Sequence, residues 1–98
     1  MQLLQHKKLS ASGVAYTGGC ALASMFIGMD GVNDPEITVY DGIDATGSEV
    51  VPTATYDASA LGLNGFHGGL LGYDCKAGIY VEITCAGTVE VVVGYKSI

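Results

Sequence analysis

The sequence predicts an all-β protein, a small antiparallel β-sandwich or jelly roll of about six to eight short strands. Two observations favour this class. Apolar and polar residues alternate over 79–85 and again over 89–95, in segments rich in β-branched side chains. Turn residues such as Gly, Asp and Asn recur between short apolar runs along most of the chain. The 98 residues are enough for one domain with a modest core.

The last third of the chain carries the strongest strand signal. Its first segment has an apolar face made by alternate residues: Ile79, Val81, Ile83 and Cys85. A second apolar face follows a short turn that contains glycine: Val89, Val91, Val93 and Tyr95. Two alternating segments joined by a short turn are typical of a β-hairpin. Because a hairpin is not stable alone, we expect the rest of the chain to supply a second layer against its apolar face.

The upstream strands are predicted from similar patterns, in chain order. Residues 13–17 begin extended, and the apolar run 20–29 follows a Gly-Gly bend. We interpret 20–29 as a strand buried on both faces, although its Ala, Leu and Met residues also favour a helix. Residues 36–41 alternate clearly. Residues 49–56 form a further strand, and Pro52 places it at a sheet edge or a bulge because proline cannot donate a ladder hydrogen bond.

Residues 57–72 are the least regular part of the chain, and we predict a long loop there. The segment holds five glycines and few charges, and long loops in compact domains are usually functional or ordered by a partner. Five apolar side chains and one histidine are candidate subunit or partner contacts: Leu61, Leu63, Phe66, His67, Leu70 and Leu71. Two interpretations of the apolar members stay open, contact with another molecule and closure of the open end of the core.

The domain organisation is predicted as an N-terminal arm over 1–12 and a single β-sandwich domain over 13–98. Leu3, Leu4 and Leu9 would allow the arm to dock on a neighbouring subunit. A frayed terminus is the alternative interpretation of the arm.

The composition restricts the function classes. Hydrophobic residues make up 49% of the chain and charged residues only 14%, whereas soluble surfaces usually carry about 25–35% charge. Either the exposed surface is rich in small uncharged residues or other subunits cover part of it, and we favour the second explanation. The net charge is −6, with four lysines and no arginine. We therefore expect no nucleic-acid binding and no docking on an anionic membrane surface.

The three cysteines, Cys20, Cys75 and Cys85, have spacings that fit neither a disulfide framework nor a zinc site. We expect Cys20 and Cys85 to be buried as small apolar residues, and a Cys75–Cys85 bridge is the alternative. The apolar run 20–29 is too short to span a bilayer, and no targeting segment is recognisable. We therefore expect the chain to be made in the cytoplasm.

No constellation of residues predicts catalysis, so we expect a protein that is not an enzyme and needs no cofactor. His67 has no nucleophile or carboxylate placed beside it in the sequence. A ligand-binding β-sandwich module for carbohydrate or calcium is the alternative function. Four aspartates would hold calcium if their two loops met: Asp30, Asp34, Asp41 and Asp44. The six tyrosines would suit a sugar-stacking face, although packing between strands is the more ordinary interpretation.

Three segments resemble small structural proteins of tailed bacteriophages. They lie at 37–42, 78–84 and 87–95, with the motifs T-V-Y-D-G, G-I-Y-V-E-I-T and G-T-V-E-V-V-V-G-Y. The resemblance covers about 12–95 and implies a β-sandwich virion component of head-decoration, head-fibre or neck-appendage type. Such a protein would be a homo-oligomer that docks on a capsid or tail assembly and is located in the virion. The resemblance carries over no functional residues, because such proteins act through surfaces.

Overall fold

The computed structural model describes residues 4–58 and 65–97, and of residues 65–72 it describes the backbone alone. The described residues form eight strands: β1 (Gln5–Leu9), β2 (Gly13–Thr17), β3 (Cys20–Met29), β4 (Glu36–Asp41), β5 (Ser48–Thr55), β6 (Gly65–Cys75), β7 (Gly78–Thr84) and β8 (Val89–Ser97). Within this part of the chain, no helix is long and apolar enough to cross a membrane.

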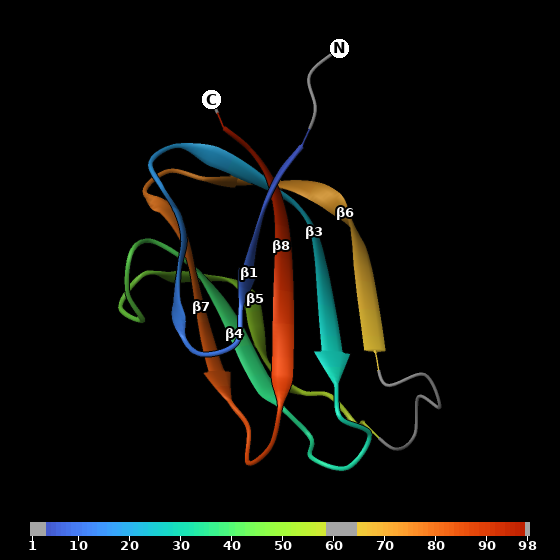
Figure 1. The fold of residues 1–98 in the computed structure, drawn as a ribbon. Coiled ribbons are helices and arrows are strands. Elements are labelled where there is room, and N and C mark those ends of the chain that lie inside the picture. The colour runs from blue at the N-terminus through green and yellow to red at the C-terminus, as the bar shows by residue number, and fades with distance from the viewer. Residues whose placement is uncertain (1–3, 59–64, 98) are drawn as a thin grey trace.

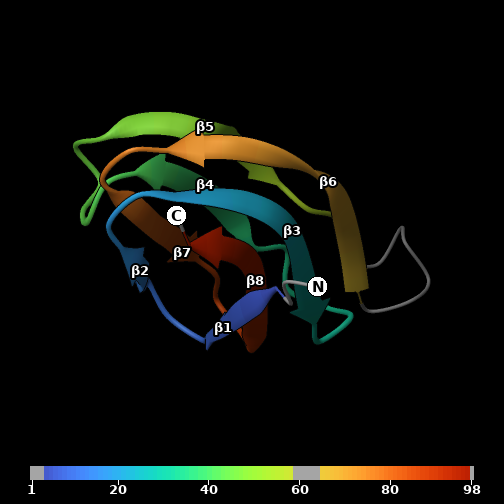
Figure 2. The same cartoon turned by 90° about the horizontal axis from the view of Figure 1, so that it is seen from above.

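Two four-stranded sheets pack together in two layers (Figure 1). Sheet A has the strand order β1-β8-β3-β6, and sheet B has the order β2-β7-β4-β5. The order of sheet A can be followed across its layer from above in Figure 2. Every strand pairing is antiparallel. The predicted fold class, a small antiparallel all-β sandwich, is confirmed.

The pairings show how the chain is wound. β1 pairs with β8, β2 with β7, β3 with β6 and β4 with β5, so the chain runs as one long hairpin whose tip is the β4–β5 turn. Successive pairs of this hairpin alternate between sheets A and B. The β3–β8 and β4–β7 pairings then complete the two sheets. Eight strands wound in this way form a jelly roll.

The core lies between the inner faces of the two sheets. Alternate residues along the central strands point inward, because successive side chains of a strand lie on opposite faces. The side chains that are 0% exposed come from β3, β4, β7 and β8: Cys20, Ile27, Ile37, Val39, Ile79, Val81, Val91 and Val93. Burial of apolar surface stabilises the fold by about 25 cal/mol per Å². Each sheet therefore needs the other to cover its apolar face.

The hairpin predicted over 78–95 is wrong, because β7 lies in sheet B and β8 lies in sheet A. The turn after β7 carries the chain from one sheet to the other. The alternation itself is real, since Val81 of β7 and Val91 of β8 are both fully buried. Alternation shows only that a strand buries one face. It does not distinguish two strands paired edge to edge from two strands that face each other across a core.

The loop predicted over 57–72 is wrong in its second half, where β6 begins at Gly65. β6 pairs with β3 from the Gly28–Gly65 pair to the Cys20–Cys75 pair. Glycine has a low β propensity, so the local sequence carries no strand signal there. The pairing with β3 supplies the order that the local sequence does not predict.

Three other strands can be compared with the sequence-based expectations. β3 is buried on one face rather than on both, because Phe26 on its outer face is 43% exposed. The strand that contains Pro52 is β5, and its predicted place at a sheet edge is confirmed. Residues Gln5–Leu9 form β1 and pair with β8, so the sandwich begins before residue 13. Whether 1–12 contacts a second subunit stays a prediction.

One corner of the sandwich is tied by hydrogen bonds between distant segments. The Asp41 carboxylate, at the end of β4, accepts the backbone N–H groups of Lys76 and Ala77, both at 2.9 Å. Gly78 follows with a φ of +147°, and a Cβ there would collide with the carbonyl oxygen of Tyr16. Only glycine fits such a position without strain. The corner fixes the end of β6 and the start of β7.

Candidate functional site

The outer edge of β6 is the least protected strand edge in the described part of the fold. Sheet A ends at β1 and β6, and sheet B ends at β2 and β5. β6 is 11 residues long and carries no proline and no charged residue from Gly65 to Tyr73. Among the described strands it pairs only with β3. An edge strand presents backbone N–H and C=O groups that can pair with another chain.

The other three edges carry features that hinder such pairing. β1 holds Lys7 and Lys8, and β5 holds Glu49 and Pro52. β2 is only five residues long, and its register with β7 shifts along its length. Charges, proline, irregular register and shortness are the means by which proteins prevent sheets from joining edge to edge. β6 also has a register shift, between Gly69 and Tyr73, but its regular part over 65–69 carries neither charge nor proline. We call the outward side of this strand the β6 edge.

The structure places the predicted contact residues partly on this edge strand. Leu61 and Leu63 lie outside the described residues. The other four lie in β6, where the structure describes only the backbone of these residues: Phe66, His67, Leu70 and Leu71. In the register with β3, His67 is opposite Phe26, and the register shifts before Tyr73. The regular part of the strand is therefore 65–69.

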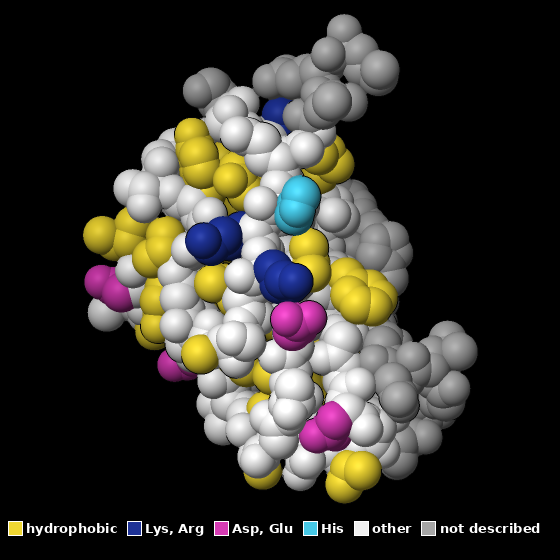
Figure 3. Space-filling model, viewed as in Figure 1, with side chains coloured by type: hydrophobic (Ala, Val, Ile, Leu, Met, Phe, Trp, Pro, Cys, Tyr) yellow, Lys and Arg dark blue, Asp and Glu magenta, His cyan; other side chains and the backbone are white. Residues whose placement is uncertain are grey.

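The outer face of sheet A lies beside β6, and lysine and acidic side chains are mixed with exposed apolar ones on it (Figure 3). Phe26 is 43% exposed and is the register partner of Val92 on β8. On the other side of β8, Val92 pairs with Lys8 of β1. The Lys8 ammonium lies 3.9 Å from the Glu90 carboxylate. Such an exposed ion pair contributes little to stability. An exposed aromatic ring bordered by charged side chains suits contact with another protein. The exposure of Phe26 differs from the expectation that 20–29 is buried on both faces.

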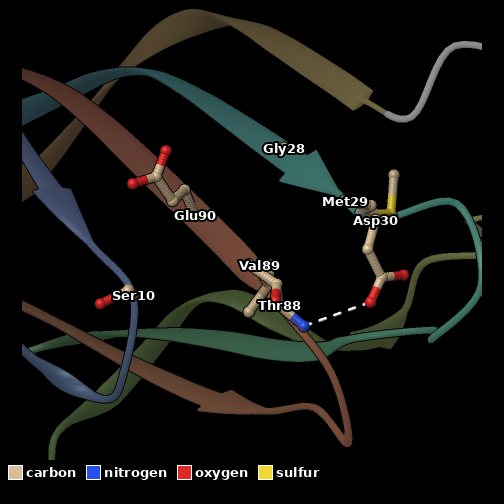
Figure 4. Close-up of a pocket in the computed structure, with 7 residues that line it drawn as sticks. All are labelled: Ser10, Gly28, Met29, Asp30, Thr88, Val89 and Glu90. Carbon is tan, nitrogen blue, oxygen red and sulfur yellow. Dashed lines mark hydrogen bonds between the residues drawn. The ribbon is translucent and has the colours of Figure 1, made fainter.

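A groove of about 340 Å³ opens where β3 ends and β8 begins (Figure 4). Seven residues line it: Ser10, Gly28, Met29, Asp30, Thr88, Val89 and Glu90. Its volume is at the lower end of the range of about 300–1,000 Å³ that small-molecule sites occupy. Figure 4 shows the Glu90 carboxylate on β8 and the Asp30 carboxylate just after the end of β3, with the Thr88 N–H joined to Asp30.

Asp30 has a structural task in this groove. Its carboxylate accepts the backbone N–H groups of Asn33 and Val32 at 2.8 Å, the Asn33 side-chain amide at 2.8 Å and the Thr88 N–H at 3.2 Å. These donors, with Asn33 the strongest, hold the pKa of Asp30 well below its usual range. The carboxylate therefore ties the β3–β4 loop to the turn before β8, and little of it is left to bind a ligand.

The four loop aspartates do not meet. Asp30 and Asp34 precede β4, whereas Asp41 and Asp44 lie at its far end, and the six-residue strand between them is about 20 Å long. Asp34 accepts the Ala58 N–H at 2.9 Å, and Asp44 accepts the Thr46 N–H at 2.9 Å. No group of three or more His, Cys, Asp or Glu residues in the described part of the chain is placed to hold a metal ion. The calcium site that would need all four aspartates is not formed.

A second surface lies on the outer face of sheet B, where Tyr40 and Tyr80 are register partners. Their ring centroids are 6.3 Å apart, with the planes inclined at 48°. The Tyr40 hydroxyl donates to the Glu82 carboxylate at 3.2 Å. Burial, together with the charge of Glu82, raises the pKa of Tyr40, so the phenol stays a neutral donor at pH 7. Half-exposed rings beside a carboxylate offer a stacking surface and a hydroxyl acceptor, as sugar recognition requires.

The sequence alone does not distinguish which of the six tyrosines would form a sugar-stacking face. The structure separates the outer pair from Tyr16 and Tyr95, whose ring centroids lie 4.9 Å apart on the inner side of the fold. Tyr40 and Tyr80 are neighbours because β4 pairs with β7. The residue pattern within a single strand cannot predict this pairing.

Comparisons with protein-family models, with curated proteins and with solved structures returned no match. The described residues therefore define the protein by its fold and surfaces, as an eight-stranded jelly roll in which β6 is an edge strand. Because a fold does not determine a function, the functional argument has to rest on those surfaces.

Proposed function

We propose that this protein is a non-enzymatic structural subunit that self-associates and docks into a larger assembly through the β6 edge. The observation that carries the proposal is the contrast between β6, which lacks charge and proline over 65–73, and the three protected edges. We further propose that the assembly is a phage-type virion, with capsid or tail proteins as further partners. The motifs at 37–42, 78–84 and 87–95 support this assignment through their resemblance to small virion proteins.

Self-association would pair two β6 strands antiparallel about a two-fold axis. Residues 65–69 pair continuously with β3, so the opposite side of this segment presents a regular row of backbone groups. Pairing two such rows joins two four-stranded copies of sheet A into one continuous sheet. Backbone groups that otherwise bond to water gain protein partners, and the two outer faces that carry Phe26 become one surface for further docking.

The composition and the fold class both support this proposal. Only 14% of the residues are charged, and a surface that other subunits cover needs fewer charges than a fully exposed one. Jelly rolls occur in viral capsid domains and in lectins. The shared fold class is only an analogy, so it supports the proposal less strongly than the features of the β6 edge do.

A proline scan over Phe66, His67, Gly68 and Gly69 tests the proposed pairing. Successive backbone N–H groups of a strand point to opposite sides, so proline at alternate positions removes a bond either to β3 or to the second copy. The four variants form two pairs of alternate residues, Phe66 with Gly68 and His67 with Gly69. In the pair whose N–H groups point away from β3, we expect a lower native mass, measured by light scattering, and a melting temperature near that of the wild type. The other pair should mainly lower the melting temperature.

The matched control is His6→Pro on β1, the opposite edge of the same sheet. Its native mass should equal that of the wild type, because β1 is not part of the proposed interface. A scan in which no β6 variant loses mass without also losing stability would rule out the β6 edge as the site of association.

A second candidate function, sugar binding, is favoured by the Tyr40–Tyr80 pair and the neighbouring Glu82. A pyranose ring would stack on the tyrosines while Glu82 accepts a hydroxyl. Calorimetric titration with a panel of soluble oligosaccharides tests it, with Tyr80→Ala as the test variant. Tyr73→Ala is the control, since Tyr73 is 51% exposed and lies in the other sheet. Heat that Tyr80→Ala abolishes and Tyr73→Ala preserves would favour this function over the structural one.

A further inference from the structure

Two of the three cysteines face each other across the β3–β6 pairing. Cys20 is the first residue of β3, Cys75 is the last residue of β6, and they are direct register partners. Both are buried, with exposures of 0% and 1%. The Cys75 thiol donates to the Tyr73 carbonyl oxygen at 3.9 Å, and both cysteines are free thiols in this structure.

The strand geometry brings these residues within the range of a disulfide. Directly opposite residues of an antiparallel pair have Cα atoms about 4.5–5.5 Å apart, according to the type of pair. Disulfides join Cα atoms about 4.4–6.8 Å apart. We propose that Cys20 and Cys75 are a modification site, a cross-strand pair that oxidation closes to a disulfide joining β3 to β6. The expected alternative, a Cys75–Cys85 bridge, lacks this register relationship.

The oxidant is a small-molecule disulfide such as oxidised glutathione. One cysteine thiolate attacks a sulfur of the oxidant, releases one small thiol and forms a mixed disulfide. The second cysteine thiolate then displaces the other small thiol and forms the Cys20–Cys75 bond. The two cysteines lose two electrons and two protons in total, and the two small thiols carry them away. A reducing compartment drives the same exchange backwards.

Burial determines when the bond can form. Burial, with the neighbouring Cys20 and Asp41, raises the pKa of the Cys75 thiol to about 12, and burial also raises the pKa of Cys20. Because the thiolate is the attacking species, the folded protein should oxidise slowly near neutral pH. Oxidation should be faster while the chain folds or when β6 separates from β3.

The disulfide would fasten the C-terminal end of β6 and close the chain over 20–75. A bond that closes a long segment restricts the unfolded chain, and such bonds typically raise the melting temperature of a domain of this size by about 8 °C or more. This inference does not rest on the proposed function, because it depends only on the β3–β6 register. It does concern the strand through which we propose association.

The experiment refolds the denatured protein with oxidised glutathione in one arm and with dithiothreitol in the other. We expect the oxidised arm to show one free thiol under denaturing conditions, a mass lower by about 2 Da and a higher melting temperature. Peptide mapping should join Cys20 to Cys75. The reduced arm should show three free thiols, the cysteine content of the chain.

Two variants separate the possible pairings. Cys85→Ser should keep the bond and the rise in melting temperature, whereas Cys20→Ala should lose both. Three free thiols after oxidative refolding, or a bond mapped to Cys85, would overturn the proposal. If Cys20→Ala fails to fold, the peptide map of the wild-type protein still decides between the pairings.

Discussion

Asp41 and Ala77 are joined by a 2.9 Å hydrogen bond from the Ala77 backbone N–H to the Asp41 carboxylate, although 36 positions separate them in the chain. The same carboxylate accepts the Lys76 N–H at 2.9 Å. The bonds hold the end of β4 in sheet B against the turn where the chain leaves β6 in sheet A. Asp41 therefore stabilises the corner at which the two sheets of the jelly roll meet.

Replacing Asp41 with Ala should destabilise the fold by about 1 to 2 kcal/mol, because two charge-assisted hydrogen bonds are lost and water replaces them only in part. Chemical denaturation monitored by circular dichroism measures the change in the free energy of unfolding. The matched control is Glu36→Gln, an exposed carboxylate at the other end of β4. Equal stabilities for the two variants would show that the Asp41 bonds do not stabilise this corner.

Stability should fall in acid. Backbone and side-chain donors lower the pKa values of Asp41, Asp30 and Asp44 in the folded protein, with the Lys76 N–H as the largest cause for Asp41. In the unfolded chain the pKa of these carboxyls is about 3.9. The unfolded state therefore binds more protons around pH 4, so this stability is present above that pH and is lost as the pH falls through the folded pKa values.

Thermal melts between about pH 7 and pH 2 should show a nearly constant melting temperature down to about pH 5 and a decline below it. Asp41→Asn should show a shallower decline than the wild type, because it lacks one of the lowered carboxyls. Parallel curves for the two proteins would contradict the role given to Asp41.

Gly78→Ala should destabilise the fold by about 1 to 3 kcal/mol, because the φ of +147° is strained for alanine and its Cβ would meet the Tyr16 carbonyl. For a domain of this size, each kcal/mol lowers the melting temperature by about 4–8 °C. Gly28→Ala is the control, since a Cβ there makes only ordinary contacts, the nearest at 3.5 Å from the Phe26 ring. A similar loss in both variants would mean that the backbone of Gly78 is not under special constraint.

The three thiols of the reduced protein should react at two different rates. Cys85 is half-buried, whereas Cys20 and Cys75 are buried in the core. An aromatic disulfide reagent at pH 8 should therefore modify one cysteine quickly and the other two slowly, because the buried pair is both shielded and protonated. In denaturant all three should react together. Uniform fast reaction of the folded protein would contradict the burial of the pair.

The fold class could be predicted from the sequence because burial on one face leaves a period-two pattern in each strand. Residues 36–41 and 79–83 show that pattern and are strands. The pairing of β7 and β8 could not be predicted in the same way. Val81 and Val91 belong to opposite layers of one core, and residues that face each other in this way leave the same local pattern as a hairpin.

The candidate site was predicted less well, for a related reason. Residues 65–72 are rich in glycine, and the strand that begins at Gly65 depends on the pairing of 65–69 with β3 rather than on local propensity. The pairs Tyr40–Tyr80 and Cys20–Cys75 likewise arise from register between strands that are far apart in sequence. The jelly-roll winding pairs the first strand with the last and proceeds inward, so it brings β3 and β6 together, whereas the Tyr40–Tyr80 pair arises from the additional β4–β7 pairing.

The measurement that tests the central proposal most directly is the native mass of the wild-type protein by light scattering across a dilution series. We predict a mass at least twice that of the 10.0 kDa chain at high concentration, declining toward the monomer as the two β6 edges separate. A clean monomer at every concentration would contradict self-association through β6 and would move the sugar-binding surface at Tyr40 and Tyr80 ahead of it.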